Sequence, residues 1–384
     1  MRLALHGGFG EKGRTSLGVD ARGGRVLLDA GVMTSARGTP DYWPAIPPEA
    51  LRALDAIVVT HAHEDHAGAL GWCLANGFAG RILMSGAARA GCEDIVAAYD
   101  SPDAARKLRA ARIEELPVGA DAAEVGALRL STGRSGHISG GLWCLVDDGS
   151  TRLLYCGDVV PASPVFAMDP LPDGDALILD ASYGDDATSA PARAAEIAGW
   201  VRAHPQGSIL PTPLFGRSLE LFALLREHLA LAPGMREALA AQIDAAEWLA
   251  RGVADRLRSA LARTPSCGTN EPLPRAAILC DDGMGMSGPS RELLEVAARN
   301  GHPVLLTGHV PDASPAHRLL ESGAAQWIRL PTHPTLAQNL AIAAASRARL
   351  VLGHSCERDA LARLARHLPR LDADAMTGAV LELD

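Results

Sequence analysis

Short apolar runs separated by turn-forming residues fill the first two hundred positions of the chain. Each run is four to six residues long, is rich in Val, Leu and Ile, and lies beside Gly, Asp or Ser. Because buried strands have this length and composition, the runs predict strands, and helical spacing at 88–99 and 190–203 predicts helices. Many strands with few early helices favour a layered sandwich with its helices outside. The predicted strands are 25–29, 56–60, 81–84, 142–146, 152–156 and 176–180.

The pattern changes at about residue 205, where longer helical segments begin to alternate with short strands. This alternation is typical of an open, largely parallel sheet. The predicted strands of this part are 208–211, 276–280 and 303–307, and the predicted helices are 218–230, 235–249 and 254–263. Beyond residue 324 the pattern predicts strands at 326–330, 350–353 and 378–383 and helices at 336–346 and 357–367.

The highest concentration of side chains that can bind a metal lies directly after the strand predicted at 56–60. Three histidines and an aspartate occur within the six residues from His61 to His66. His61, His63 and His66 offer imidazole nitrogens and Asp65 offers a carboxylate, which are ligand types that zinc prefers. A lone histidine is more often structural, but four ligand-type side chains at this spacing rarely arise for packing alone. The run therefore predicts a metal site.

Two metal ions need further ligands, and three later positions offer them. His137 lies in Ser-Gly-His-Ile-Ser-Gly, where glycines allow the backbone to approach a bound group closely. Asp158 and His354 each follow a predicted strand and a glycine, and a carboxylate such as Asp158 can bridge two cations. Taken alone, each of these residues is a turn residue about as often as a ligand.

In this order, the motifs resemble those of the metallo-β-lactamase superfamily. Asp29, in Leu-Leu-Asp-Ala-Gly, matches an early aspartate of that superfamily and would orient a ligand or the bridging hydroxide. The resemblance implies two Zn²⁺ ions, with Mn²⁺ as the alternative metal. The implied ligands are His61, His63 and His137 for one ion and Asp65, His66 and His354 for the other, with Asp158 bridging both.

The middle of the chain resembles the β-CASP domain of nucleic-acid-processing enzymes such as ribonuclease J and the cleavage-and-polyadenylation endonuclease. The segment that ends at Arg217, the glycine-rich stretch 282–291, Asp180 before Ser-Tyr-Gly, and His333 carry this resemblance. It implies an α/β fold in which a metallo-β-lactamase αββα sandwich carries an inserted parallel-sheet β-CASP domain. The implied domains are 1–198 and 325–384 for the sandwich and 199–324 for the insertion.

The same resemblance implies hydrolysis of a phosphodiester in nucleic acid. Two cations that share a hydroxide lower the pKa of bound water towards about 7 and stabilise the charge of the transition state. His333, held by Asp180, is the expected general acid or phosphate contact. The expected catalytic residues are Asp29, Asp65, Asp180 and His333, and the expected substrate contacts are Arg217, Ser287, Ser290 and Thr335.

Composition and charge limit the kinds of partner and the cell compartment that we expect for the protein. The net charge of −9 provides no global positive field for nucleic acid. No apolar run reaches the roughly 20 residues that span a bilayer, and glycines interrupt the N-terminus before a signal-peptide core. Seven cysteines without a CxxC pair argue against a disulfide framework. We therefore expect a cytoplasmic protein without a membrane partner. The resemblance implies in addition that the protein binds RNA or single-stranded DNA and, like many members of the family, forms a homodimer.

Three functions remain open at this point. The first is a β-CASP ribonuclease, acting as an exonuclease or endonuclease in RNA processing or decay. The second is a small-molecule ester or thioester hydrolase, which the insertion and the His333/His354 pair disfavour. The third is a non-catalytic RNA-binding scaffold, but such proteins lose metal ligands and all seven candidates are present here. Pro334 and Ser355-Cys356 depart from the residues that are common in the family.

Overall fold

The computed structural model describes residues 1–312 and 314–383, which form two compact units. The first unit comprises Met1–Ala162, Met168–Ala187 and the chain from His333 onward, and the second comprises Ser163–Ala167 and Thr188–Thr332. The boundaries predicted at 199 and 324 fall within the second unit. Residue 199 lies inside helix α6 (Ala190–Ala203), so a boundary at that residue would divide a helix.

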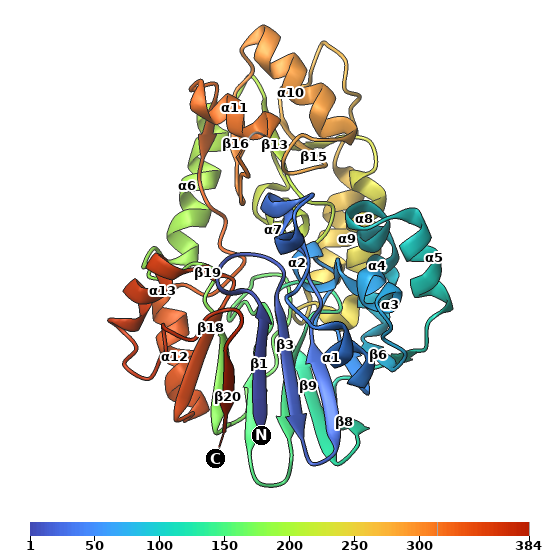
Figure 1. The fold of residues 1–384 in the computed structure, drawn as a ribbon. Coiled ribbons are helices and arrows are strands. Elements are labelled where there is room, and N and C mark those ends of the chain that lie inside the picture. The colour runs from blue at the N-terminus through green and yellow to red at the C-terminus, as the bar shows by residue number, and fades with distance from the viewer. Residues whose placement is uncertain (313, 384) are drawn as a thin grey trace. The chain divides into compact units, whose positions relative to one another are not determined.

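Two β-sheets form the centre of the first unit (Figure 1). The first sheet has the strand order β20-β1-β3-β4-β5-β6-β7 and the second has the order β18-β12-β11-β10-β9-β8. The first sheet consists of β20 (Val380–Glu382), β1 (Arg2–Gly7), β3 (Ser16–Ala21), β4 (Gly24–Leu28), β5 (Ala56–Val58), β6 (Arg81–Met84) and β7 (Ile113–Glu115). The second consists of β18 (Leu350–His354), β12 (Ala176–Asp180), β11 (Arg152–Tyr155), β10 (Leu142–Asp147), β9 (Leu128–Arg134) and β8 (Gly119–Val125).

Alternation along the strands explains why these sheets pack in layers. Leu27 and Ile57 belong to an apolar cluster with helices α1 (Pro48–Ala53), α3 (Leu70–Ala75), α4 (Gly86–Tyr99) and α5 (Pro102–Ala110). Their equally buried neighbours Val26 and Leu28 point to the opposite face, because successive side chains of a strand alternate. Leu154 and Leu177 likewise pack with α12 (Leu336–Ser346) and α13 (Arg358–Ala365) on the outside of the second sheet.

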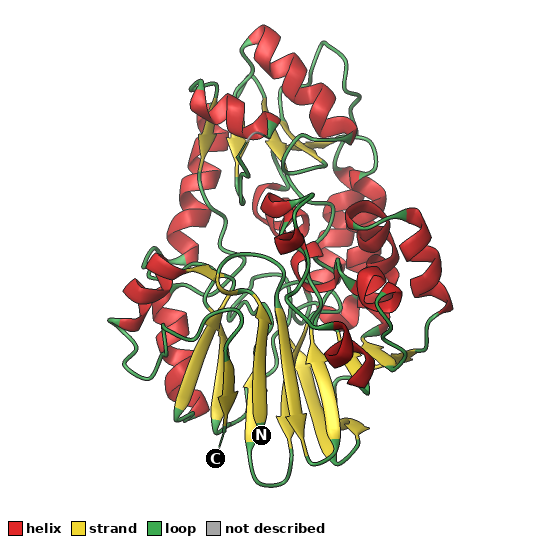
Figure 2. Ribbon diagram, in the orientation of Figure 1, coloured by secondary structure: helices red, strands yellow, loops and turns green. Residues whose placement is uncertain are grey.

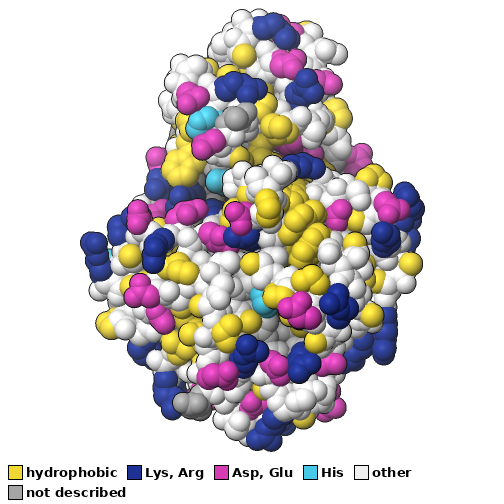
Figure 3. Space-filling model, in the orientation of Figure 1, with side chains coloured by type: hydrophobic (Ala, Val, Ile, Leu, Met, Phe, Trp, Pro, Cys, Tyr) yellow, Lys and Arg dark blue, Asp and Glu magenta, His cyan; other side chains and the backbone are white. Residues whose placement is uncertain are grey.

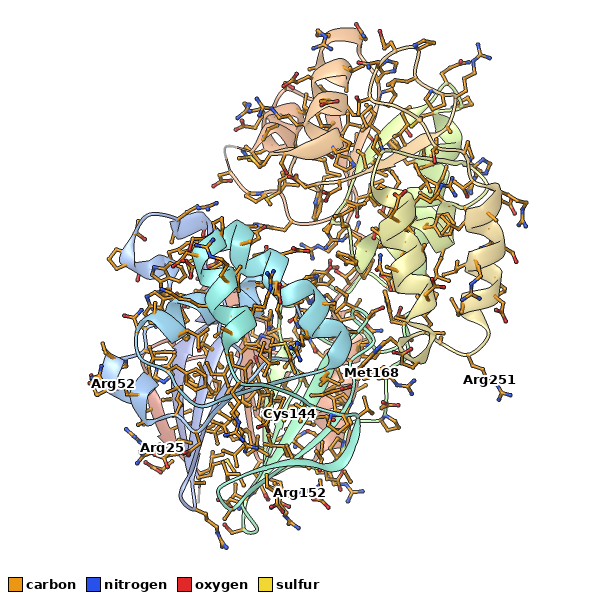
Figure 4. All side chains as sticks on the ribbon, turned by 90° about the vertical axis from the view of Figure 1, so that its right-hand side faces the viewer. Arg25, Arg52, Cys144, Arg152, Met168 and Arg251 are labelled. Atoms are coloured by element: carbon orange, nitrogen blue, oxygen red, sulfur yellow. The ribbon has the colours of Figure 1, made fainter. Side chains whose placement is uncertain are left out.

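Side-chain positions agree with this layering. Figure 4 shows Cys144 of β10 in the interior of the first unit, whereas Arg25 of β4 and Arg152 of β11 lie at its surface. Cys144 is fully buried. The unit is therefore an αββα sandwich, with its apolar contacts both between the sheets and under the helices.

The second unit contains a five-stranded, wholly parallel sheet with the order β14-β15-β13-β16-β17. Figure 2 shows its short strands among the helices. Leu and Ile side chains of the strands and helices form one apolar cluster. The strands are β13 (Ser208–Pro211), β14 (Leu229–Leu231), β15 (Ala277–Cys280), β16 (Val304–Leu306) and β17 (Ala325–Trp327), and the helices besides α6 are α7 (Arg217–Leu225), α8 (Met235–Asp244), α9 (Val253–Arg263), α10 (Gly288–Asn300) and α11 (Pro315–Glu321).

The predicted fold class, an αββα sandwich with an inserted parallel sheet, is confirmed. Some elements differ from the pattern. The helix predicted at 218–230 ends at Leu225, because Leu229–Leu231 pairs with β15 as strand β14. Strands β8 and β9 escaped prediction, because polar residues dilute their apolar pattern. Within residues 1–312 and 314–383, no helix has the length and apolarity of a membrane span.

Candidate metal centre

The ligand candidates of the first unit lie at or just beyond strand ends. Asp29 follows β4, the His61–His66 run follows β5, and Asp158 follows β11. Asp180 ends β12 and His354 ends β18, and these two residues are partners in the register of neighbouring parallel strands. Strand ends place polar side chains beside one another without exposing the apolar interior between the sheets.

The His61–His66 segment, which runs into the short helix α2 (Glu64–Ala67), is fixed to the sheet by its backbone. The amides of Thr15, Ala30 and Val32 donate to carbonyl groups of residues 64–66 over distances of 2.8–2.9 Å. A Cβ atom added to Gly31 would lie 1.8 Å from the Asp65 carbonyl oxygen, so only glycine allows this close packing. The segment therefore keeps its shape through contacts that involve none of its ligand side chains.

Four of the predicted ligands converge into one group. The side-chain ligand atoms of His61, His63, His137 and Asp158 all lie within 4.8 Å of one another. His63 Nδ1 is 3.1 Å from His61 Nε2 and 3.2 Å from His137 Nε2. Ligands held tetrahedrally at zinc–nitrogen distances of about 2.0–2.1 Å are roughly 3.3 Å apart. The three imidazoles therefore have the spacing of ligands around one four-coordinate cation.

The protonation of these imidazoles suits a ligand role. Burial lowers the pKa of His61 well below its usual value, that of His63 to about 4 and that of His137 to about 3. All three rings are therefore neutral at pH 7, and a neutral imidazole offers a nitrogen lone pair to a cation.

A second position lies around His66. Its Nε2 atom is 3.2 Å from Asp158 Oδ1 and 3.8 Å from Asp65 Oδ2. His66 Nε2 and Asp158 Oδ1 are buried and form no hydrogen bond. Burial alone would lower the pKa of His66, but the carboxylates of Asp158 and Asp29 outweigh it and raise this pKa well above its usual value. The position thus favours a positive charge, and a second cation fits it.

The Asp29 carboxylate holds His66, the central residue of this second position. It accepts hydrogen bonds from the Thr60 amide (2.7 Å), the Thr60 hydroxyl and the Tyr155 hydroxyl (2.7 Å). His66 Nδ1 also lies 2.7 Å from Asp29 Oδ2. A hydrogen bond from Nδ1–H to a carboxylate fixes the tautomer that leaves Nε2 available to a metal. Asp29 therefore fixes the orientation of the His66 ring.

His354 is oriented differently from the other candidates. Its Nε2 lies 2.9 Å from the Gly157 carbonyl oxygen, and its Nδ1 lies 3.0 Å from Ser355 Oγ. Ser355 Oγ in turn lies 3.1 Å from Thr15 Oγ1. Ser355 has a φ of +56°, in the left-handed region that favours glycine. The structure brings His354 to within 6.0 Å of His66 between ring centroids, with Nε2 engaged by a carbonyl group.

His333 and Asp180 lie beside the first group. His333 Nδ1 is 3.0 Å from Asp180 Oδ2 and 3.6 Å from Asp158 Oδ2. Burial opposes protonation of His333, but the two carboxylates raise its pKa above the usual value. Asp180 also accepts hydrogen bonds from the Val159 and Ser182 amides, so its orientation is fixed. The ring of His333 is therefore anchored through Nδ1, and its Nε2 atom is directed away from this anchor.

The four residues predicted to contact substrate differ in their burial and in their hydrogen-bond partners. Thr335 caps α12 in a capping box with Gln338, and Ser290 is fully buried with its hydroxyl 3.3 Å from Cys280 Sγ. The exposed Ser287 donates to Asp282. Arg217 begins α7 and donates to Thr332 Oγ1. Thr335 and Ser290 thus have local structural partners, and Ser287 and Arg217 are the more accessible pair.

Several residues of the centre escaped sequence analysis. Thr60 and Tyr155 hold Asp29, and Thr15 and Ser355 hold His354. The sequence did not indicate a role for Tyr155, because a tyrosine in an apolar strand is usually an ordinary core residue. Thr60 directly precedes the histidine run, and Thr15 directly precedes strand β3, so their positions were weak indications of a role.

A model of the metallo-β-lactamase superfamily matches residues 13–199. This match includes the histidine run, His137, Asp158 and Asp180. The resemblance to the metallo-β-lactamase superfamily is confirmed by this match. It agrees with the convergence of ligand candidates from strands far apart in sequence at one edge of the sandwich.

Individual relatives extend the match beyond that model. The chain is 26% identical to the transcription termination factor FttA of Methanothermobacter thermautotrophicus, over 66% of this chain and 43% of the relative. It is 27% identical to the endoribonuclease YSH1 of Mycosarcoma maydis, over 83% of this chain and 41% of the relative. The chain thus spans less than half the length of these relatives. The resemblance to β-CASP nucleases is confirmed by these matches.

A solved structure supports the fold independently of sequence. A protein of unknown function from Enterococcus faecalis V583 superimposes with a TM-score of 0.64 at 12% identity, covering 100% of this chain and 99% of that protein. At this identity the likeness concerns the fold alone.

Replacing Tyr155 with Phe tests the anchoring of Asp29. We expect the free energy of unfolding, measured by urea denaturation, to fall by about 1.5–3 kcal/mol, because the substitution removes a buried hydrogen bond to a carboxylate. Tyr42→Phe is the matched control, since the Tyr42 hydroxyl donates to a neutral carbonyl, that of Tyr99, and its loss should cost only about 0.5–1.5 kcal/mol. Equal losses for the two variants would contradict the anchoring role.

Proposed function

We propose that the protein is a metal-dependent phosphodiester hydrolase that cleaves RNA. One observation carries the proposal: His61, His63, His137 and Asp158 converge within 4.8 Å next to the buried, unpartnered atoms His66 Nε2 and Asp158 Oδ1. Relatives named as an endoribonuclease and a ribonuclease support the substrate class, the second being ribonuclease TTHA0252 of Thermus thermophilus at 28% identity over 43% of this chain and 40% of the relative.

Zinc is the proposed metal. His61, His63 and His137 would hold one ion, and His66 and Asp65 would hold the second, with Asp158 shared between the two. His354 would join the second ion when its Nε2 turns from the Gly157 carbonyl. When bound, the ions supply Lewis acidity that activates water and offsets negative charge on the phosphate. Three imidazoles with one carboxylate favour zinc over magnesium, which prefers oxygen ligands.

His333 is the proposed general acid. Asp180 accepts a hydrogen bond from Nδ1–H and raises the pKa of the ring, which favours a second proton at Nε2. Donation of this proton to the departing oxygen would prevent a charged leaving group from forming. Tyr183 packs against the ring in a T-shaped arrangement, with centroids 5.0 Å apart and ring planes at 75°, and restricts its rotation.

The surface charge suggests that RNA is held by local contacts. Figure 3 shows Lys and Arg side chains interspersed with Asp and Glu over the visible face, without a broad region of one sign. Because the affinity of a basic groove falls steeply with salt, binding by a few local contacts should depend only weakly on ionic strength.

Replacing His63 with Ala tests the metal site. We expect the bound metal, measured by mass spectrometry of the desalted protein, to fall and cleavage of end-labelled RNA to be lost. His204→Ala is the control, because His204 bonds to the Trp200 carbonyl in the second unit, and it should retain both properties. Metal-loaded wild-type protein that leaves RNA intact but hydrolyses a thioester would instead establish a small-molecule hydrolase.

Replacing His333 with Ala separates proton transfer from metal binding. We expect the cleavage rate to fall by about 10²–10⁴-fold, which is typical for the loss of a general acid. The metal content should remain that of the wild type, since the ring nitrogen of His333 is held by Asp180. Asp180→Asn should lower the rate in the same direction. Loss of metal in the His333 variant would show that this ring is a ligand.

Replacing Ser355 with Gly tests the anchoring of His354. Glycine relieves the left-handed backbone but removes the hydroxyl beside His354 Nδ1, so the weaker of two zinc affinities should fall by about 10–100-fold in chelator competition. Arg347→Gly is the matched control, because Arg347 has the same φ of +56° and lies at the end of α12. Unchanged zinc affinity in Ser355→Gly would restrict Ser355 to a structural role.

A further inference from the structure

The buried face of helix α12 begins with a polar residue. Helix α12 packs on the outside of the second sheet (Figure 1), and its buried residues recur at the spacing of one helix face. They are Asn339, Ile342, Ala343 and Ser346. Asn339 is 0% exposed, although asparagine is unfavourable inside helices because its side chain competes with the backbone for hydrogen bonds. Neither packing nor helix formation explains an asparagine at this position.

The Asn339 side chain bonds to the main chain of Asp180. Asn339 Nδ2 donates to the Asp180 carbonyl oxygen over 3.0 Å. Because a carbonyl oxygen can only accept, the amide has to turn Nδ2 towards it and Oδ1 away from it. Among the described residues, the buried Oδ1 then has no hydrogen-bond partner. Since an unpaired buried acceptor destabilises a fold, the orientation of this amide serves Asp180 at the expense of Asn339.

The Asp180 carbonyl lies beyond the end of the neighbouring strand. The Cys156 amide donates to the Ile178 carbonyl across β11 and β12, and the carbonyl of Asp180 faces the same side two residues later. Strand β11 has ended at Tyr155, and the Val159 amide donates to the Asp180 side chain. Asn339 therefore takes the place of a strand partner for the Asp180 carbonyl.

The same helix is joined closely to His333. Only Pro334 and Thr335 lie between His333 and the first residue of α12. Proline fixes its own φ and restricts the residue before it to extended conformations. Thr335 forms the capping box with Gln338 and so fixes the beginning of the helix. The main chain of His333 is therefore attached to α12 with little conformational freedom.

These contacts form a closed ring of bonds. The Asp180 carboxylate is bonded to His333 Nδ1 and the Asp180 carbonyl to Asn339, while His333 and Asn339 are joined through the first turn of α12. Gln338 Nε2 holds the same turn by donating to the Pro161 carbonyl over 3.3 Å. All of these residues belong to the first unit. A shift of α12 that carried His333 away from Asp180 would therefore also break the bond of Asn339.

We propose that Asn339 is a positioning residue for His333, because it holds α12 to the main chain of Asp180 and so fixes where the imidazole can deliver its proton. It acts only through Asp180 and His333. The catalytic consequence rests on the proposed function, whereas the ring of bonds exists without any reaction. Small displacements of a proton donor slow a reaction strongly, which makes such a brace valuable.

Asn339→Leu tests the proposal, because it keeps the branched shape of the side chain and removes its donor. With the zinc-loaded protein, kcat for RNA should fall by about 10- to 100-fold with KM unchanged. Bis(4-nitrophenyl) phosphate should be hydrolysed at the wild-type rate, because 4-nitrophenolate departs without a proton. His333→Ala should show the same selectivity. A merely structural defect would slow both substrates alike and would overturn the proposal.

Ser346→Ala is the matched control on the same helix. Ser346 is 0% exposed, and its hydroxyl donates to the Ala343 carbonyl over 3.0 Å. This variant should lower the melting temperature through the loss of a buried hydrogen bond and leave both rates unchanged. Asn339→Gln, which retains an amide donor, should recover part of the rate on RNA.

NMR of protein labelled with ¹⁵N-histidine gives a second measurement that needs no catalysis. The Nδ1–H signal of His333, assigned by its absence in His333→Ala, should be broadened in Asn339→Leu and retained in Ser346→Ala. An unchanged signal in Asn339→Leu would also overturn the proposal. Wild-type protein that leaves RNA intact while the variants show these signals would count against the proposed function alone.

Pro334→Gly covers the case in which Asn339→Leu does not fold. This variant keeps every side-chain hydrogen bond of the ring and frees the link between His333 and α12. It should slow RNA cleavage more than hydrolysis of bis(4-nitrophenyl) phosphate and broaden the same histidine signal. An unchanged rate together with an unchanged signal would contradict the positioning of His333 through α12.

Discussion

The hydrogen bonds of the buried Asp29 carboxylate connect the two layers of the sandwich to the chemistry at its edge. Thr60 reaches it from the end of β5, and Tyr155 reaches it from β11 in the opposite sheet. His66 meets the same carboxylate through Nδ1. A buried carboxylate needs several donors to be tolerated, and here those donors come from the elements that must be held in register. The packing of the sheets and the orientation of His66 therefore depend on one group.

Both units place their polar chemistry at strand ends, but they do so in different ways. In the sandwich, the strand ends supply histidines and carboxylates whose charges and protonation suit cations. In the parallel sheet of the second unit, they supply the hydroxyls of Thr212 and Thr307 and the guanidinium of Arg217. Both sets of polar residues lie at strand ends, because a polar side chain there disturbs the apolar interior least.

Local sequence predicted the fold class and most of the elements. The β5 run, α6 and α12 were predictable, since their periodicity and length agree with their structure. Strand β14 was not, because Leu229–Leu231 continues a helical pattern and only pairing with β15 makes it a strand. The histidine run was visible because its members are close in sequence. The partners Tyr155 and Ser355 were not, since their roles depend on contacts with residues 126 and 340 positions away.

The backbone hydrogen bonds between the His61–His66 segment and residues 15 and 30–32 have a thermodynamic consequence. A zinc finger becomes ordered only when its ion binds, so part of the binding free energy is used to order the chain. Here the segment loses its conformational freedom during folding. Gly31 packs directly against the backbone of Asp65, and the neighbouring backbone amides donate hydrogen bonds to the carbonyl groups of the segment. An arriving cation meets side chains already directed at it. The affinity for the cation then depends on the ligand side chains themselves, because little conformational entropy of the segment remains to be lost on binding.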